Sequence, residues 1–336
     1  MDEARGLNVS VVGATGAAGR EILALLEGGH PGVAVEEVRL FASARKSGRT
    51  LSFRGKPHPI PPLHSGCFED MDLVFFSAGA DVSRAWIPAA LDAGARVVDC
   101  SSAFRMDPEV PLLVPEVNAD ALKSTHRLVA NPNCVVTILV LPLRVIHGLS
   151  PLRRVLVTTY QAASGAGQGG IRELESGSRA VLAGTTAIQE VFPRSLAFNL
   201  VPQVGVFAEG GFTDEEWKIA RETRKILEHP DLKISATCVR VPVFRAHSEA
   251  VYVETLEAVD LQALRAALAG FPGLELQEAP DPTPEQASGQ NDVLVGRVRR
   301  DADEPRGLHF WVSGDQLLKG AALNAVQIAG KFLAST

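Results

Sequence analysis

The 336-residue chain has few cysteines, and none of them form a motif. Cys67, Cys100, Cys134 and Cys238 lie far apart, and no Cys-x-x-Cys pair occurs. This spacing argues against a zinc site and against a disulfide framework, and it fits a reducing compartment. We therefore expect no metal site and a cytoplasmic location.

The chain also lacks a long apolar run and an excess of positive charge. No uncharged apolar stretch approaches the ~20 residues that cross a bilayer, and the charged N-terminus does not have the pattern of a signal peptide. A net charge of −6 gives no reason to expect nucleic acid or an anionic membrane as a partner. The length, with 46% hydrophobic and 21% charged residues, predicts a soluble protein of two domains.

The first third of the chain has the pattern of a dinucleotide-binding fold. Residues 7–12 predict a strand, the glycine-rich turn 13–19 follows, and residues 20–26 continue as a helix. In this strand–turn–helix context, the glycines allow the backbone and the helix N-terminus to approach a pyrophosphate. Further strands at 38–42, 71–77 and 96–100, with a helix at 83–93, predict a doubly wound parallel sheet, an α/β Rossmann-like domain.

The loop after the second predicted strand favours NADP over NAD. NAD-binding folds usually carry an acidic residue here for the ribose 2′-hydroxyl. This chain has Ser43 and Arg45 instead, which suit a 2′-phosphate. The alternative is a solvated basic loop without a role in binding.

Cys134 is placed where a thiolate would be stabilised. It follows Asn131-Pro132-Asn133 and precedes residues 135–143, which predict a buried helix. The unpaired N–H groups of a helix N-terminus favour an anion, and a thiolate is a competent nucleophile. The alternative is a cysteine that only packs in the core.

The remaining chain predicts a second, α+β domain with a mainly antiparallel or mixed sheet. We expect strands at 154–160, 238–243 and 250–254, with residues 245–248 between the last two. Residues 161–170 form a glycine-dense segment, either a ligand-binding loop or a flexible turn. Thr213 and Glu216 have the spacing of a capping box for a helix at 213–227. An apolar helix at 315–329 could return to the first domain, so the expected domains are 1–132 with 315–336, and 133–314.

Several separated segments together resemble the aspartate-β-semialdehyde dehydrogenase family over nearly the whole chain. They are the turn 13–19, Ser101–Arg105, Asn131–Cys134, Gln161 with Ser164-Gly165, Arg240–Val243 with His247-Ser248, and Lys319–Asn324. The resemblance implies reversible, NADPH-dependent reductive dephosphorylation of 4-phospho-L-aspartate to L-aspartate 4-semialdehyde. This reaction belongs to lysine (diaminopimelate), threonine and methionine biosynthesis.

The resemblance also implies roles for individual residues. Cys134 forms an acyl thioester as the acyl phosphate loses phosphate, His247 is the acid–base residue, and Gln161 orients the substrate. The implied substrate contacts are Arg240 for the α-carboxylate, Arg105 and Lys218 for the phosphate with Asn133 assisting, and Glu215 for the amino group. The implied NADP contacts are Gly13, Thr15, Gly16, Ala17, Ala18, Ser43, Arg45, Ser164, Gly165 and Asn324, the last at the nicotinamide amide.

Three points stay open at this stage. Glu216 is adjacent to Glu215, so either could face the substrate, and Glu215 with Lys218 could instead be an exposed i,i+3 ion pair. Family members often have Gly before the catalytic His, where this chain has Ala246. A β-carbon is tolerable there unless the backbone requires a positive φ.

The family resemblance implies a homodimer or a dimer of dimers. Two other functions compete with the one proposed. One is the sister reductase acting on N-acetylglutamyl or aminoadipyl phosphate, whose cysteine motif usually has Gly where this chain has Asn133. The other is a catalytically silent dinucleotide-binding homologue, which would have no reason to keep Cys134, Gln161, Arg240 and His247 together.

Overall fold

A computed structural model describes residues 6–43 and 48–334, and the chain divides into two compact units. The first unit is Met1–Asn133 with Ala321–Thr336, and the second is Cys134–Gly320. The sequence analysis placed the two divisions after residues 132 and 314; the compact units divide after residues 133 and 320. Arg45 lies outside the described residues.

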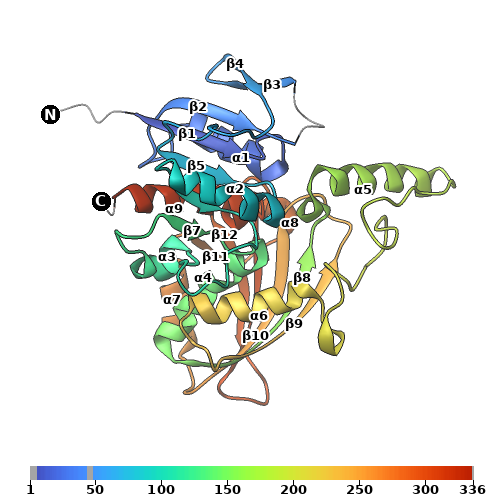
Figure 1. The fold of residues 1–336 in the computed structure, drawn as a ribbon. Coiled ribbons are helices and arrows are strands. Elements are labelled where there is room, and N and C mark those ends of the chain that lie inside the picture. Colours follow the sequence, from blue (N-terminus) through green and yellow to red (C-terminus); the bar gives the residue numbers. More distant parts are fainter. Residues whose placement is uncertain (1–5, 44–47, 335–336) are drawn as a thin grey trace. The chain divides into compact units, whose positions relative to one another are not determined.

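The described part of the first unit contains a five-stranded parallel sheet with the strand order β2-β1-β5-β6-β7 and a hairpin of β3 and β4 (Figure 1). Its elements are β1 (Leu7–Val12), α1 (Ala17–Glu27), β2 (Val35–Phe41), β3 (Arg49–Phe53), β4 (Lys56–Ile60), β5 (Leu73–Phe76), α2 (Ala80–Asp92), β6 (Arg96–Asp99), α3 (Pro115–Asn118), β7 (Leu128–Ala130) and α9 (Leu323–Ala334).

Both faces of this sheet are covered, as a doubly wound fold requires. Ile22 of α1 and Val326 and Phe332 of α9 pack with Val9 and other residues in one core. Ile87 and Ala90 of α2 pack with Val12 and Phe76 in a second core. The predicted Rossmann-like α/β fold is therefore confirmed, and ligands of such sheets bind at the carboxyl ends of the strands.

The described part of the second unit contains a six-stranded mixed sheet with the strand order β11-β12-β13-β10-β8-β9. Its elements are α4 (Cys134–Leu149), β8 (Leu152–Gln161), α5 (Gly167–Leu182), α6 (Asp214–Ile226), β9 (Lys233–Arg240), β10 (His247–Thr255), α7 (Leu261–Ala269), β11 (Leu274–Gln277), α8 (Pro284–Ala287), β12 (Val293–Arg300) and β13 (Gly307–Gly314). The predicted α+β domain with a mixed sheet is confirmed.

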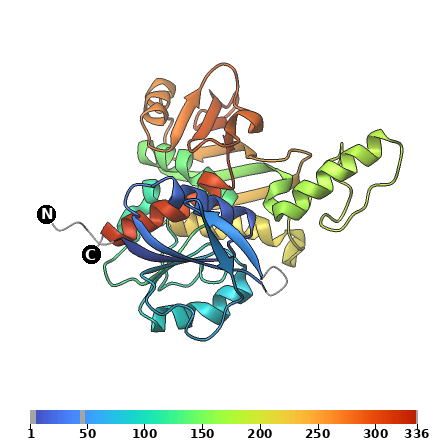
Figure 2. The same ribbon diagram turned by 90° about the horizontal axis from the view of Figure 1, so that it is seen from above.

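Helices cover one face of this sheet. α4 contacts β8, β10 and β13, α6 contacts β9, and α7 contacts β11 and β12. The opposite face carries rings in contact with each other, with ring centroids 5.3 Å apart for Tyr160 and Trp311 and 4.9 Å apart for Tyr252 and His309. α5 extends away from the sheet (Figure 2). No helix in residues 6–43 and 48–334 is long and apolar enough to cross a membrane.

Four predicted segments differ from the structure. The strand predicted at 238–243 is β9, which begins at Lys233 and ends at Arg240. The strand predicted at 250–254 begins earlier, at His247, so His247 is a strand residue and not part of a connecting loop. The glycine-dense segment 161–170 becomes a short 3₁₀ turn and the start of α5. The helix predicted at 315–329 is interrupted: residues Leu318–Ala322 form a π-helical turn, and α9 follows it.

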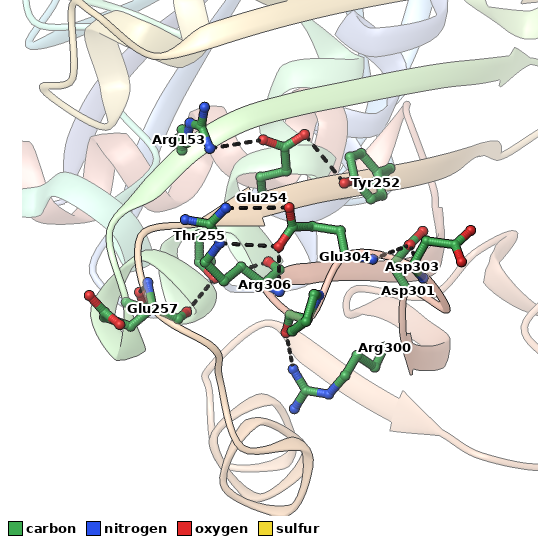
Figure 3. A network of polar contacts seen from close by, with 12 residues as sticks. Arg153, Tyr252, Glu254, Thr255, Glu257, Arg300, Asp301, Asp303, Glu304 and Arg306 are labelled. Carbon is green, nitrogen blue, oxygen red and sulfur yellow. Dashed lines mark hydrogen bonds and ion pairs between the residues drawn. The ribbon is translucent and has the colours of Figure 1, made fainter.

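A polar network lies at the start of β8 and the end of β10, away from His247 (Figure 3). Glu254 pairs with Arg153 and accepts a hydrogen bond from the Tyr252 hydroxyl, and Glu304 pairs with Arg306. Thr255, the last residue of β10, is eight residues from His247, roughly 26 Å at about 3.3 Å per residue. This network therefore joins neighbouring segments of the sheet at the end opposite His247.

Candidate active site

The glycine turn after β1 has the geometry of a pyrophosphate cradle. Gly13 has a φ of +91°, and a β-carbon on it would lie 2.3 Å from the carbonyl oxygen of Ser77. A β-carbon on Gly19 would lie 2.3 Å from the carbonyl oxygen of Gly13. α1 begins at Ala17 with Gly16 as its N-cap and has no side-chain cap hydrogen bond. Its first backbone N–H groups are therefore suited to an anion, so the residues present fit a dinucleotide.

Other predicted first-unit residues also follow the carboxyl ends of strands. Thr15 belongs to the turn after β1, Ala18 lies in the first turn of α1, and Ser43 is an exposed residue after β2. Asn133 is buried and follows β7. The structure thus collects these residues at the sheet edge where doubly wound folds bind ligands.

Arg105 is a buried cation with a fixed orientation. Its Nε donates to the carbonyl oxygen of Asn131 at 3.0 Å, and its Nη2 donates to the carbonyl oxygen of Cys100 at 3.1 Å. These carbonyls follow β7 and β6, so two neighbouring strands hold the guanidinium. Burial and the neighbouring Asp99 raise the pKa of Cys100 to about 12, so Cys100 stays a thiol and is not a nucleophile.

Asn324 is fully buried near the start of α9. Its Nδ2 donates to the carbonyl oxygen of Leu113 at 3.0 Å and to Oδ1 of Asn131 at 2.8 Å. Both donors of its amide nitrogen are therefore used inside the first unit.

Cys134 is the first residue of α4, as predicted from its sequence context. The residues that follow it, Val135 to Leu143, are all buried, so the helix is anchored by its apolar body. Gly320 lies directly against it: a β-carbon on Gly320 would be 3.1 Å from Cβ of Cys134. Cys67 and Cys238 are buried thiols whose pKa values are raised, mainly by burial. Cys134 thus occupies the setting expected of a nucleophile.

Gln161, Arg240 and His247 lie side by side on three adjacent strands. Gln161 at the end of β8 pairs with Arg240 at the end of β9. Ser248 of β10 pairs with Tyr160 of β8, so His247 begins β10 next to Gln161. Three residues separated by up to 86 positions in the sequence therefore form one row at the end of the sheet.

The backbone N–H and carbonyl groups of Ala162 hold two of these side chains. Nη1 of Arg240 donates to the carbonyl oxygen of Ala162 at 2.7 Å, and the N–H of Ala162 donates to Nδ1 of His247 at 3.0 Å. Because Nδ1 is the acceptor, the neutral imidazole carries its proton on Nε2. Burial and the charge of Arg240 hold the pKa of His247 well below its usual range, so the ring is neutral near pH 7.

Gly165 lets the chain approach this pair closely. A β-carbon on Gly165 would lie 2.7 Å from Nη1 of Arg240 and 3.2 Å from Nε2 of His247. Within the described residues, Nε2 of His247 is buried without a hydrogen-bond partner. Burial lowers the pKa of Arg240, while the negative charges of Cys134 and Glu215 act in the opposite direction. Cys134 is therefore close enough to Arg240 for their charges to interact.

The structure distinguishes Glu215 from Glu216. Glu216 completes the predicted capping box: its Oε2 accepts from the N–H of Thr213 at 2.7 Å, and its Oε1 accepts from the N–H of Cys238 at 3.0 Å. Glu215 is 8% exposed, and its Oε1 accepts from Nε2 of Gln161 at 3.3 Å. Glu215 is thus the carboxylate beside the row of Gln161, Arg240 and His247, and it is not part of an exposed ion pair.

Lys218 lies one helical turn from Glu215. Its Nζ is 3.3 Å from Oε2 of Glu215 and 2.6 Å from Oδ2 of Asp214. Burial opposes the charged form, but the two carboxylates raise the pKa of Lys218 above its usual value. Lys218 is therefore a permanent cation next to the row.

Sequence reasoning missed three polar residues near the row. Thr159 donates to Oε1 of Gln161 at 3.0 Å, which fixes the amide orientation of Gln161; the alternation of β8 could have indicated this. Asp315 and Gln316 contact the turn before His247; they lie just before the matched segment 319–324, but nothing in the pattern singled them out. The described residues contain no group of three or more His, Cys, Asp or Glu side chains that could hold a metal ion.

Comparison with known proteins agrees with this geometry. Residues 8–125 match the family described as semialdehyde dehydrogenase, NAD binding domain, and residues 142–319 match semialdehyde dehydrogenase, dimerisation domain. The chain is 45% identical to an aspartate-semialdehyde dehydrogenase of Synechocystis sp. over 96% of each chain. The chain belongs to the aspartate-semialdehyde dehydrogenase family.

Solved structures of this family have the same fold. Aspartate semialdehyde dehydrogenase II of Vibrio cholerae, in a complex with ASA, has a TM-score of 0.94 and 39% identity, covering 98% of this chain and 99% of that one. An aspartate semialdehyde dehydrogenase of Candida albicans with NADP has a TM-score of 0.77 at 23% identity, covering 98% and 99%, and shares the fold. The family resemblance is confirmed, and neither alternative function is favoured.

Proposed function

We propose that this chain catalyses the reversible, NADPH-dependent reductive dephosphorylation of 4-phospho-L-aspartate to L-aspartate 4-semialdehyde and phosphate. The observation that carries the proposal is the backbone of Ala162, which holds Arg240 and His247 beside Gln161 in a member of this family. The residue roles below follow from this arrangement.

Arg240 and Glu215 are assigned to the two charged groups on the α-carbon of the substrate. A guanidinium fork suits a planar carboxylate, and Arg240 is already fixed by the carbonyl oxygen of Ala162. Glu215 is a buried acceptor that suits an ammonium group, and Gln161 links it to the same row. An amino acid held by both ends would present its side-chain carbonyl group in a defined direction.

Cys134 is assigned to attack the acyl phosphate. The thiolate forms a C–S bond, the C–O bond to phosphate breaks, and phosphate leaves with the bonding electron pair. We assign binding of the phosphate to Arg105, Asn133 and Lys218. Cysteine suits this step because its thiolate is both a good nucleophile and a good leaving group.

His247 is assigned to stabilise negative charge on the reacting carbonyl oxygen. NADPH, when bound, supplies the hydride that reduces the thioester. The resulting thiohemiacetal oxyanion can accept a hydrogen bond from Nε2–H of His247. When the oxyanion collapses, the C–S bond breaks, the aldehyde is released and Cys134 returns to a thiolate. The proton consumed overall ends on the released phosphate, so His247 can stay neutral throughout.

The residues assigned to NADP are those that the family resemblance implies. Gly13, Thr15 and Gly16 of the turn, with Ala17 and Ala18 at the start of α1, take the pyrophosphate. Ser43 and Arg45 take the 2′-phosphate, and Ser164, Gly165 and Asn324 take the nicotinamide half. The absence of an acidic residue at position 43 supports NADP over NAD.

We also propose that the chain assembles as a homodimer or a dimer of dimers in the cytoplasm. The family description of residues 142–319 as a dimerisation domain supports self-association. Exposed apolar side chains after α5, among them Phe198, Leu200 and Phe207, support it as well. Light scattering coupled to size-exclusion chromatography measures the assembly.

The activity is tested by following NADP reduction with L-aspartate 4-semialdehyde in the presence and absence of phosphate. We expect reduction that requires phosphate and is lost in Cys134→Ala. Parallel reactions use NAD, and N-acetylglutamate semialdehyde as the alternative substrate. A higher kcat/KM with N-acetylglutamate semialdehyde would overturn the proposal, and no turnover with either aldehyde would support the catalytically silent homologue.

A further inference from the structure

The residue before His247 has an unusual backbone conformation. Ala246 has a φ of +69°, a region that residues with a β-carbon rarely adopt. The side chain of Ala246 is buried next to Ala287 and Leu294. Such a conformation persists only where the surrounding structure imposes it. Because Ala246 is directly bonded to His247, whatever imposes this conformation also sets the direction of the imidazole.

Gln316 holds the turn from one side. Its Oε1 accepts a hydrogen bond from the N–H of Ala246 at 2.8 Å. Its Nε2 donates to Oγ of Ser164, in the loop that follows β8. The side chain is buried, and both ends of its amide are used. One amide therefore connects the turn before His247 to the loop that carries Gly165.

Asp315 holds the same turn through its neighbour. Its carboxylate is fully buried, and Oδ2 accepts from Nε of Arg245 at 2.6 Å and from the N–H of Gly289 at 2.7 Å. Its Oδ1 accepts from the N–H of Leu317 at 2.9 Å. Main-chain donors thus fix this carboxylate, and the fixed carboxylate holds Arg245. Residues 315 and 316 together contact both residues that precede His247.

We propose that Gln316, supported by Asp315, is a positioning residue for His247. Gln316 acts through the backbone of Ala246, which keeps Nδ1 of His247 on the Ala162 N–H and keeps Nε2 beside Gly165. Without the amide, the turn can relax to a negative φ, which rotates the Cα–Cβ bond of His247 away from Ala162. The inference rests on the function proposed for His247.

The test compares Gln316→Leu with Gln277→Leu. Leucine keeps the volume but removes both hydrogen bonds of the amide. Gln277 lies on β11 in the same unit, where its Nε2 donates to Oε1 of Glu275. We expect kcat of Gln316→Leu to fall by about 10- to 100-fold, since a displacement near 1 Å has effects of that size. KM for the aldehyde and for NADP should change less than about threefold, and Gln277→Leu should stay within about twofold.

Two readouts separate positioning from a general structural defect. In protein labelled with ¹⁵N-histidine, NMR should show His247 as the neutral Nε2–H form, and this signal should shift or broaden in Gln316→Leu. Alkylation of Cys134 by iodoacetamide should keep its rate within about threefold, because Cys134 lies outside the contacts described for Gln316. Adding Ala246→Gly to Gln316→Leu should restore at least about threefold of kcat, because glycine accepts a positive φ without a β-carbon.

The outcomes are decisive in both directions. Wild-type kcat with an unchanged His247 signal in Gln316→Leu would overturn the inference. A defect confined to KM for NADP would overturn it as well, since it would make Gln316 a cofactor contact. Gln316→Asn, which keeps the amide but is one methylene shorter, replaces the leucine variant if that does not fold, with the same expectations. If His247→Ala keeps full turnover, the proposed function fails. If His247→Ala loses turnover but Gln316→Leu keeps it, only the positioning role of Gln316 fails.

Discussion

The backbone N–H of Ala162 donates to Nδ1 of His247 at 3.0 Å, and this bond determines which ring nitrogen of the imidazole carries the proton. A ring nitrogen that accepts a hydrogen bond has no proton of its own. His247 therefore presents an N–H donor at Nε2, next to Gly165, and not a lone pair. A donor at this position suits a developing oxyanion, and the acid–base role that the resemblance implies for His247 stays a prediction.

His247→Asn should keep more activity than His247→Ala. Asparagine offers an N–H donor of shorter reach, whereas alanine offers none, so we expect kcat of the asparagine variant to exceed that of the alanine variant by about tenfold. Because the pKa of His247 is held well below its usual range, titration of His247 should not lower the kcat of the wild type between pH 6 and 9. Steady-state kinetics across this range measure both effects. Equal activity of the two variants would contradict the donor role.

Cys134 should be the fast-reacting thiol of the native protein. The pKa of Cys100 is raised to about 12, and burial raises the pKa values of Cys67 and Cys238, so these three should react slowly with iodoacetamide near pH 7. Mass spectrometry of the alkylated protein identifies the modified residue. Cys134→Ala should lose this reaction and reduce turnover on the order of 10⁴-fold or more, with NADPH affinity unchanged. Rapid labelling of a different cysteine would contradict the assignment.

Arg240→Lys should impair substrate binding although it keeps the charge. A lysine ammonium lacks the planar fork and cannot both hold the carbonyl oxygen of Ala162 and bind a carboxylate bidentately. Charge-assisted hydrogen bonds contribute about 1.5–3 kcal/mol, so kcat/KM for the aldehyde should fall by about 10- to 100-fold. Arg172→Lys, at an exposed position on α5, serves as the control. An Arg240→Lys enzyme with wild-type kcat/KM would rule out the carboxylate role.

Glu249→Gln should change how stability depends on pH. Glu249 is fully buried on β10, neither of its carboxyl oxygens has a hydrogen-bond partner within the described residues, and burial raises its pKa well above the usual 4.5. The folded state keeps this proton, whereas the unfolded state releases it above about pH 4.5. The wild type therefore loses stability as pH rises toward the folded-state pKa, by up to about 1.4 kcal/mol per pH unit.

In the glutamine variant this loss should be absent. Urea unfolding at pH 5, 6.5 and 8 gives the free energy of unfolding of both proteins, and their difference should shift in favour of Glu249→Gln as pH rises. Glu285→Gln, at an exposed position in α8, should show no such trend. A difference that stays constant over this range would mean that Glu249 is ionised in the folded protein.

Much of this structure could be predicted because it depends on contacts between residues that are close in the sequence. The glycines of the turn 13–19 are required by backbone contacts within that segment and with its neighbouring strand, so the sequence carries the signal directly. The capping box of Thr213 and Glu216 is similarly local. Its presence already assigns Glu216 to the helix cap, so the sequence could have identified Glu215 as the residue facing the row.

The parts that sequence reasoning missed depend on tertiary contacts. The predicted strand begins at Ala250, whereas β10 begins at His247 and includes Ser248 and Glu249, two polar residues that are buried. A buried acid that stays protonated has no local sign in the sequence. Likewise, the positive φ of Ala246 depends on Gln316, 70 residues further along the chain, so only the folded structure reveals it.

The position of α9 has a consequence for how the protein is made. Its residues Val326, Ile328 and Phe332 belong to the same core as Val9 and Ile22, yet the whole second unit is encoded between them. During translation the first unit emerges early but cannot complete this core until the ribosome has added nearly all the remaining residues. Chains that terminate early would keep an open apolar sheet face, which chaperones and proteases recognise, so incomplete copies should be cleared before they accumulate.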